Sequence, residues 1–138
     1  MKKSHENAYA IYLLTHGLLH IIYKKGRCID LKAARTIVND RMMLQEGREM
    51  PILCDIREVR RVNKPARDYF AREGSLWISA LAFLIDPPVA NTISSFYMGT
   101  HAQKVVTRSF TKKSEAVAFL RTTMASILIT WTIQLIPL

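Results

Sequence analysis

Residues 50–70 read MPILCDIREVRRVNKPARDYF, and this stretch carries most of the information on the fold class of the chain. Its first part, MPILCDI, is a compact apolar run ending near a carboxylate, which is typical of a strand buried on both faces. A basic loop follows. Pro65 then stands where proline is tolerated in the first turn of a helix, which residues 65–78 can form, with Gly74 expected to end or interrupt it. A buried strand, a loop and a helix in this order indicate an α/β domain.

Upstream of this stretch, the sequence predicts a β-hairpin and a helix. The apolar runs AYAIYLL (8–14) and LLHIIYK (18–24) flank Thr15, His16 and Gly17, which suit a short turn. Asp30 is a suitable N-cap for a helix over residues 31–46, and Gly47 is a suitable stop. The chain is therefore expected to open with two paired strands and to cover them with a helix.

Downstream, strands and helices continue to alternate. ISALAFLI (78–85) and KVVTRSF (104–110) predict strands, whereas residues 89–100 and 112–121 predict helices, the second of them capped by Thr111. The whole order is β-β-α-β-α-β-α-β-α. It predicts a mixed β-sheet with parallel pairs, covered by about four helices.

The composition fits one folded domain with acidic partners. Of the 138 residues, 49% are hydrophobic and 22% are charged, which is enough apolar material for a core. The 20 Lys and Arg exceed the 11 Asp and Glu by nine charges, and such an excess favours acidic partners. Cys28 and Cys54 have no metal-ligand spacing and are expected to be reduced thiols. We expect no cofactor, no metal, and a cytoplasmic location without a signal peptide.

Four segments together resemble the STAS superfamily, the fold of sulfate-transporter cytoplasmic domains and anti-sigma-factor antagonists, and more narrowly bacterial STAS/SEC14-like proteins of unassigned role. The segments are HGLLHIIYKKGRCIDLKAA (16–34), PILCDIREVRRV (51–62), PARDYFAREG (65–74) and RSFTKKSEAVAFLR (108–121). The likeness covers roughly residues 6–121. It implies a STAS-like domain over residues 1–121 and leaves a hydrophobic tail, residues 122–138, unexplained.

The resemblance also implies a position for a regulatory serine, at the start of the helix after the central strand. That position here reads Asn63-Lys64-Pro65 and has no hydroxyl. Lys64 places a positive charge where a phosphate would bring negative charge. The sequence therefore argues against a phosphoserine switch, although binding through the same surface remains expected.

The basic segment from Arg57 to Arg72 is the leading candidate for a binding surface. It contains six basic and two acidic residues, and it follows the carboxyl end of a central strand, where ligands of open α/β sheets commonly bind. The alternative is a solvated face in which Asp68 and Glu73 pair with nearby arginines. The predicted partner-binding residues are Arg57, Arg60, Arg61, Lys64 and Arg67.

Three smaller features of the sequence are weaker site candidates. Lys112 and Lys113 oppose the dipole at a helix start, so they form an anion-site candidate, with plain surface as the alternative. His16 and His20 share a spacing used by metal ligands but lack a third ligand nearby, so hairpin packing is favoured. Cys54 has no adjacent base and is expected to be a small core residue.

The tail contains no charged residue in seventeen positions. As a helix it would reach about 25 Å, short of the roughly 30 Å hydrocarbon core. Its apolar residues alternate with Thr130, Thr132 and Gln134, a period of two that favours a strand. A docked or swapped strand, membrane attachment and a free end all stay open. The residues that would dock or insert are Ile129, Trp131, Ile133 and Leu135.

These features predict a non-enzymatic STAS-like binding or regulatory module that recognises an acidic partner, most simply a protein. No glycine-rich phosphate loop, paired catalytic carboxylates or serine elbow is visible in the sequence. The alternative is a membrane-peripheral or lipid-binding STAS/SEC14-like protein attached through its tail. A homodimer is compatible with either function, whereas no motif for nucleic-acid recognition is visible.

Overall fold

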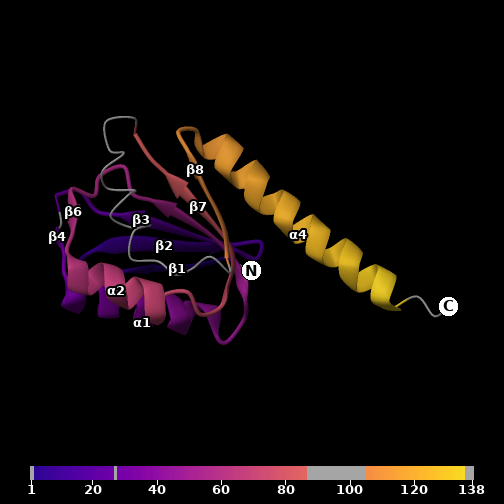
Figure 1. Cartoon of the computed structure of the whole chain (residues 1–138), viewed down its shortest axis with the longest axis horizontal. Helices are drawn as coiled ribbons and strands as arrows, with labels where there is room; N and C mark the ends of the chain where they lie inside the picture. The colour runs from indigo at the N-terminus through magenta and orange to yellow at the C-terminus, as the bar shows by residue number, and fades with distance from the viewer. Residues whose placement is uncertain (1, 27, 87–104, 136–138) are drawn as a thin grey trace.

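The computed structural model describes residues 2–26, 28–86 and 105–135, with side chains as far as Met124. Its centre is a mixed sheet with the strand order β1-β2-β3-β5-β7-β8 (Figure 1). β1 (Lys2–Glu6), β2 (Ala10–Thr15) and β3 (Leu18–Tyr23) pair antiparallel, whereas β5 (Met50–Asp55), β7 (Ile78–Leu84) and β8 (Val106–Phe110) continue from β3 in parallel. The predicted α/β class and mixed sheet are confirmed.

The predicted opening hairpin is β2 and β3. Its two turn residues, His16 and Gly17, have φ angles of 52° and 76°. Positive φ at both central residues is the geometry that matches the twist of paired strands, and glycine adopts it without steric cost. The short turn therefore sets the register, in which Thr15 pairs with Leu18.

The sequence did not reveal one strand of the main sheet or a separate pair of short strands. β1 (KKSHE) has no apolar residue and forms the outer edge of the sheet beside β2. The pair β4 (Cys28–Ile29) and β6 (Arg61–Val62) makes a separate two-stranded sheet. Neither carries a hydrophobic pattern long enough to be recognised.

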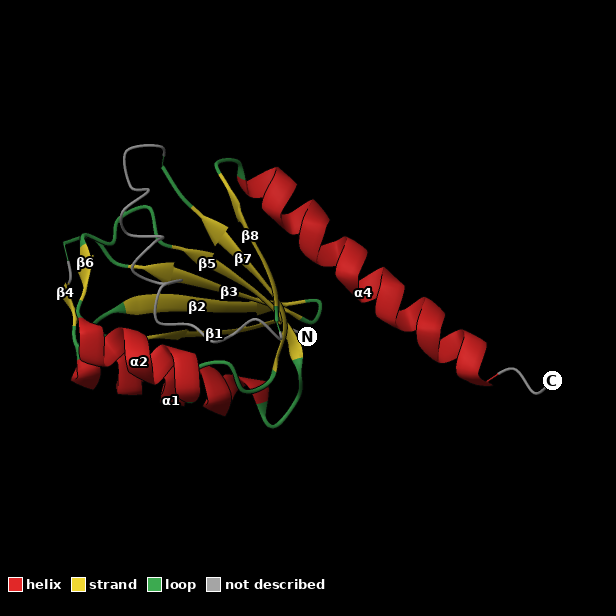
Figure 2. Ribbon diagram, viewed as in Figure 1, coloured by secondary structure: helices red, strands yellow, loops and turns green. Residues whose placement is uncertain are grey.

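Two helices cover one face of the sheet. α1 (Leu31–Gln45) begins at the predicted N-cap, where the Asp30 carboxylate accepts from the Ala33 amide, and α2 (Lys64–Arg72) contains Pro65 in its first turn. The two helices lie side by side on the same side of the sheet (Figure 2). Together they bury the main core, which includes Tyr12, Ile21, Ile37 and Ile52. α2 ends at Arg72, two residues before Gly74, where the sequence predicted an end or an interruption.

The third described helix, α4 (Lys113–Leu135), lies on the opposite face. Ala116 and Leu120 bury a second cluster with Leu53, Ala82 and Leu84, so β5 and β7 are covered on both faces. Farther along, α4 leaves the sheet and projects beyond it (Figure 1). Three helices are thus described rather than about four. The helix predicted for residues 89–100 lies outside the described residues.

The cap predicted at Thr111 is wrong. α4 begins at Lys113, and the Lys112 carbonyl accepts from the Ala116 amide, so Lys112 occupies the cap position. Thr111 lies one residue too early to satisfy the first amides of the helix. The hydroxyl of a capping threonine is therefore not what starts α4.

Of the alternatives open for residues 122–138, the docked or swapped strand is wrong, because α4 continues without a break to Leu135. The predicted boundary at Arg121 falls inside this helix. Residues 113–135 contain neither proline nor glycine, and extending an existing helix costs much less than starting one. The helix begun in the charged segment therefore runs through the alternating Ile and Thr residues.

Candidate functional site

The basic loop begins with an ion pair that fixes its first arginine. Arg57 donates from Nε to Oδ1 of Asp55 at 3.0 Å and from Nη2 to Oδ2 at 2.7 Å, in a bidentate geometry. Burial would raise the pKa of Asp55, but the hydrogen bonds from Arg57 outweigh it and hold that pKa below its usual value. Arg57 is therefore paired with Asp55 at the end of β5. Its guanidinium orients the start of the loop and is not available to bind another molecule.

Two more of the predicted residues also have partners within the chain. Lys64 donates to the Asp68 carboxylate at 2.9 Å, one helical turn away, and this contact lowers the pKa of Asp68. Arg67 donates from Nη1 to the Val62 carbonyl at 2.8 Å. Asp68 is thus paired within the segment, although its partner is Lys64 and not one of the arginines that the sequence suggested.

Arg57, Lys64, Arg60 and Arg61 are all exposed, but Arg57 and Lys64 are paired with carboxylates, whereas no such pair is described for Arg60 or Arg61. Arg61 lies in β6, whose backbone pairs with β4, so its position is defined although its side chain faces solvent. Within the described part of the chain, neither arginine forms a salt bridge. These two guanidinium groups are the ones available to another molecule.

A groove between α1 and α2 adds two cations next to this loop. Its volume is about 430 Å³, and the residues that line it are Leu31, Arg35, Lys64, Pro65, Asp68, Tyr69, Arg72 and Glu73. The guanidinium carbon of Arg35 lies 6.0 Å from the centre of the Tyr69 ring. We call Arg35, Arg60, Arg61, Lys64 and Arg72 the basic rim. Arg35 was missed because sequence spacing does not show that α1 lies against α2.

The start of α2 is the position at which the resemblance implies a regulatory serine. Asn63 is the N-cap, and its side-chain oxygen accepts from the Ala66 amide at 3.1 Å. Lys64 and Pro65 form the first turn. The helix start is thus already capped by Asn63, with a lysine beside it.

The residues of the two other candidate sites, the lysine pair and the histidine pair, do not come together in the structure. Lys113 lines a cleft between α4 and the β2–β3 hairpin, whereas Lys112 is not among the residues that line it. His16 lies exposed in the turn and His20 is buried on the sheet, so they do not form a metal site. Among the residues described, no three His, Cys, Asp or Glu side chains gather as metal ligands.

Cys54 behaves as the small core residue that the sequence predicted. It lies in the main core beneath α1 and α2. Burial raises the pKa of its thiol to about 12. Because the thiolate is the reactive form, this cysteine is poorly suited to nucleophilic chemistry.

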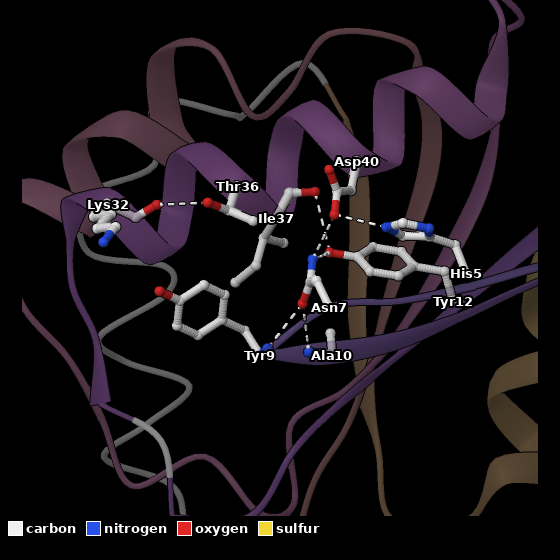
Figure 3. Close-up of polar contacts among 9 residues, drawn as sticks. All are labelled: His5, Asn7, Tyr9, Ala10, Tyr12, Lys32, Thr36, Ile37 and Asp40. Atoms are coloured by element: carbon white, nitrogen blue, oxygen red, sulfur yellow. Dashed lines mark hydrogen bonds and ion pairs between the residues drawn. The ribbon is translucent and has the colours of Figure 1, made fainter.

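A polar cluster beside α1 has a structural explanation (Figure 3). Asp40 contacts His5 Nε2 at 2.7 Å and accepts from Asn7 Nδ2 at 2.8 Å, while the Asn7 side-chain oxygen accepts from the Tyr9 and Ala10 amides. These bonds hold the turn between β1 and β2 against the helix. The cluster is used for packing the edge of the sheet.

The predicted tail residues Ile129, Trp131, Ile133 and Leu135 lie in α4, in the part whose side chains are not described. Of the helices in the described part of the chain, none is both long and apolar enough to cross a membrane. Membrane attachment through these residues stays a sequence-based prediction.

Comparison with known proteins identifies the fold first. The chain is similar to the crystal structure of an uncharacterized protein from the DUF3478 family with a SpoIIAA-like fold, from Shewanella loihica PV-4. The likeness has a TM-score of 0.51 and 12% sequence identity, and it covers 87% of this chain and 92% of that chain. The protein therefore has a SpoIIAA-like α/β fold, which agrees with the fold that the sequence resemblance implied.

The family follows from the sequence. The chain belongs to the family described as "Domain of unknown function (DUF7793)", which matches residues 12–124. No curated protein matches the sequence. The family match ends at Met124, within α4.

Proposed function

We propose that this protein is a non-enzymatic STAS-like binding module whose basic rim recognises an acidic protein partner. The observation that carries the proposal is a set of exposed cations in the α1–α2 groove and in the segment that leads into α2, where Arg60 and Arg61 have no described carboxylate partner. The groove also offers the Tyr69 ring, and an aromatic ring beside arginines is common in protein interfaces.

The geometry favours a protein over a small ligand. The groove is lined by both signs of charge, because Asp68 and Glu73 lie beside its three cations. A small anion bound there would therefore also meet two carboxylates. A partner with acidic side chains spaced over several residues could pair with Arg35, Arg60, Arg61 and Arg72 while avoiding the two carboxylates. Such charge complementarity mainly raises the association rate and the specificity.

The test is charge reversal at the two free arginines. An Arg60→Glu/Arg61→Glu variant is compared with the wild type by cross-linking in cells followed by affinity capture, with a thermal melt as the folding control. Lys2→Glu/Arg48→Glu is the matched control, since it changes the net charge equally at the opposite end of the sheet, where Lys2 pairs with Thr15.

We expect the rim variant to keep its melting temperature and lose acidic partners that the wild type and the control retain. At a typical cost of about 1–3 kcal/mol for one truncated interface arginine, partner recovery should fall at least fivefold. Equal recovery by the wild type and the rim variant, with both folded, would show that the basic rim is not the binding surface.

A further inference from the structure

A second cleft lies on the face of the sheet opposite α1 and α2. It is formed between α4 and the β2–β3 hairpin and has a volume of about 260 Å³. It shares no residue with the basic rim. The residues that line it are Leu13, Thr15, Leu18, His20, Leu53, Lys113, Val117 and Arg121.

The register of the sheet builds the floor of this cleft. His20 pairs with Leu13 on one side and with Leu53 on the other, so the three side chains form one row across β2, β3 and β5. Lys113, Val117 and Arg121 follow one another at four-residue spacing, which places them along one face of α4 above that row. Arg121 is held there by donating from Nη1 to the His16 carbonyl at 3.0 Å.

His20 is the unexplained group in the cleft. Its side chain is 8% exposed, and its Nε2 atom has no hydrogen-bond partner in the described part of the structure. Buried polar atoms of native proteins are nearly always paired, so each exception calls for an explanation. A ligand that accepts a hydrogen bond from this ring would supply the missing partner.

The charge of the cleft has one sign. Lys113 and Arg121 are both exposed, and neither takes part in a described salt bridge. Among the residues that the structure describes, no carboxylate lines the cleft. The remaining walls are apolar, with one hydroxyl from Thr15. The cleft thus combines two cations and an imidazole with leucine and valine walls.

We propose that this cleft binds a small organic carboxylate with a short apolar chain. The carboxylate lies near Lys113 and Arg121 and accepts a hydrogen bond from His20, and the chain packs on Leu13, Leu53 and Val117. If a water occupies about 30 Å³, the volume suits a ligand on the order of eight non-hydrogen atoms. A phosphate dianion would need more donors and would leave the apolar walls without contacts.

Binding of this ligand is coupled to a proton. A carboxylate beside His20 favours the protonated imidazole, so binding at neutral pH takes up a proton and strengthens as the pH falls. Lowering the pH from 7.5 to 5.5 keeps the ligand ionised, because a carboxyl group ordinarily titrates near 4.3. The charged groups that face or flank His20 on this side of the sheet are Lys113 and Arg121 of α4, Asp55 and Arg57 at the end of β5, and Lys2 and Glu6 of β1.

The experiment is an NMR titration of the full chain with hexanoate, followed through the imidazole signals of His20. We expect saturable shifts of His20 and an affinity about tenfold higher at pH 5.5 than at pH 7.5. Hexanol tests the need for the charge, and inorganic phosphate tests the need for the apolar chain. Absence of a saturable shift with hexanoate, or equal affinity for hexanol or phosphate, would overturn the proposal.

Three variants locate the site. Lys113→Gln should weaken hexanoate binding about fivefold, whereas Lys112→Gln, its neighbour outside the cleft, should bind as the wild type does. His20→Leu should weaken binding about tenfold and remove its dependence on pH, with a thermal melt to confirm folding. Equal losses for Lys112→Gln and Lys113→Gln, or an unchanged pH dependence in folded His20→Leu, would contradict the assignment.

Discussion

Single side chains in this protein owe their properties to position more than to type. Of the four histidines, His20 lies within the core of the sheet, and burial together with the Lys113 charge lowers its pKa from 6.5 to about 4. Its imidazole is therefore neutral at physiological pH. Arg57 shows the converse, because the Asp55 carboxylate raises its pKa and fixes an arginine that the sequence suggested was free.

His20 makes the stability of the protein depend on pH. Above pH 6.5 the imidazole is neutral in both the folded and unfolded chains. As the pH falls toward 4, the unfolded chain takes up a proton that the folded chain does not. The free energy of unfolding therefore decreases, by about 2–3 kcal/mol over this window.

In urea titrations His20→Leu should be more stable than the wild type at pH 7, by about 1 kcal/mol, since it removes an unpaired buried nitrogen. It should also lose less stability at pH 4.5. If His20→Leu is no more stable than the wild type and equally sensitive to pH, the buried imidazole of His20 is not the source of the pH-dependent stability.

Among the secondary-structure elements, the connection from α2 to β7 depends on two residues of α1. Arg41 donates to the Gly74 and Leu76 carbonyls, each at 3.0 Å, and also hydrogen-bonds to Gln45. Gln45 in turn donates to the Trp77 carbonyl at 2.9 Å. Trp77 has a φ of 64°, which is unfavourable for a large side chain. These hydrogen bonds hold the loop in a conformation that it would not adopt alone.

Arg41→Lys should therefore destabilise the protein although it keeps the charge. A lysine cannot reproduce the planar guanidinium that reaches two carbonyls and the Gln45 side-chain oxygen, and the Gly74 carbonyl would be left buried and unpaired. We expect a loss of about 2–4 kcal/mol in chemical denaturation. Arg35→Lys on the exposed face of the same helix is the control and should change stability by less than about 0.5 kcal/mol. Similar small changes for both variants would show that the loop does not need Arg41.

For the molecule as a whole, α4 decides how much of the sheet is covered. Without it, the second face of β5 and β7 would present Leu53, Ala82 and Leu84 to water. Phe110 and Phe119 extend this contact to the edge strand β8, with ring centres 5.5 Å apart. The first half of α4 is thus part of the domain, while its later half continues past the sheet (Figure 2).

This role of α4 predicts a large effect of Leu120→Ala. Leu120 is fully buried between the helix and the sheet, so the truncation leaves a cavity and should cost about 2–5 kcal/mol in thermal or urea denaturation. Val106→Ala on β8 is the control, because Val106 is 57% exposed and its truncation should cost little. A loss below about 1 kcal/mol for Leu120→Ala would mean that α4 is not an integral part of the fold.

Most strands and helices were predictable because each carries its own local signal. The hairpin followed from two apolar runs and a His-Gly turn, α1 from Asp30 and its apolar spacing, and β5 from its continuous apolar run. β1 was missed because an edge strand made of polar residues has no hydrophobic pattern, although edge lysines are a known guard against aggregation. The tail strand was wrong because a local period of two did not overcome the helix that precedes it.

The sequence was sufficient for the α/β class, the strand-helix order and the basic segment after β5, since these depend on neighbouring residues and on charge. The contacts across the fold required coordinates. The pairing of Arg57 with Asp55, the approach of Arg35 to Tyr69, and the placement of His20 beneath Lys113 each join residues through packing geometry. Hydrophobic periodicity states which face of an element is buried, but it does not state what that face meets.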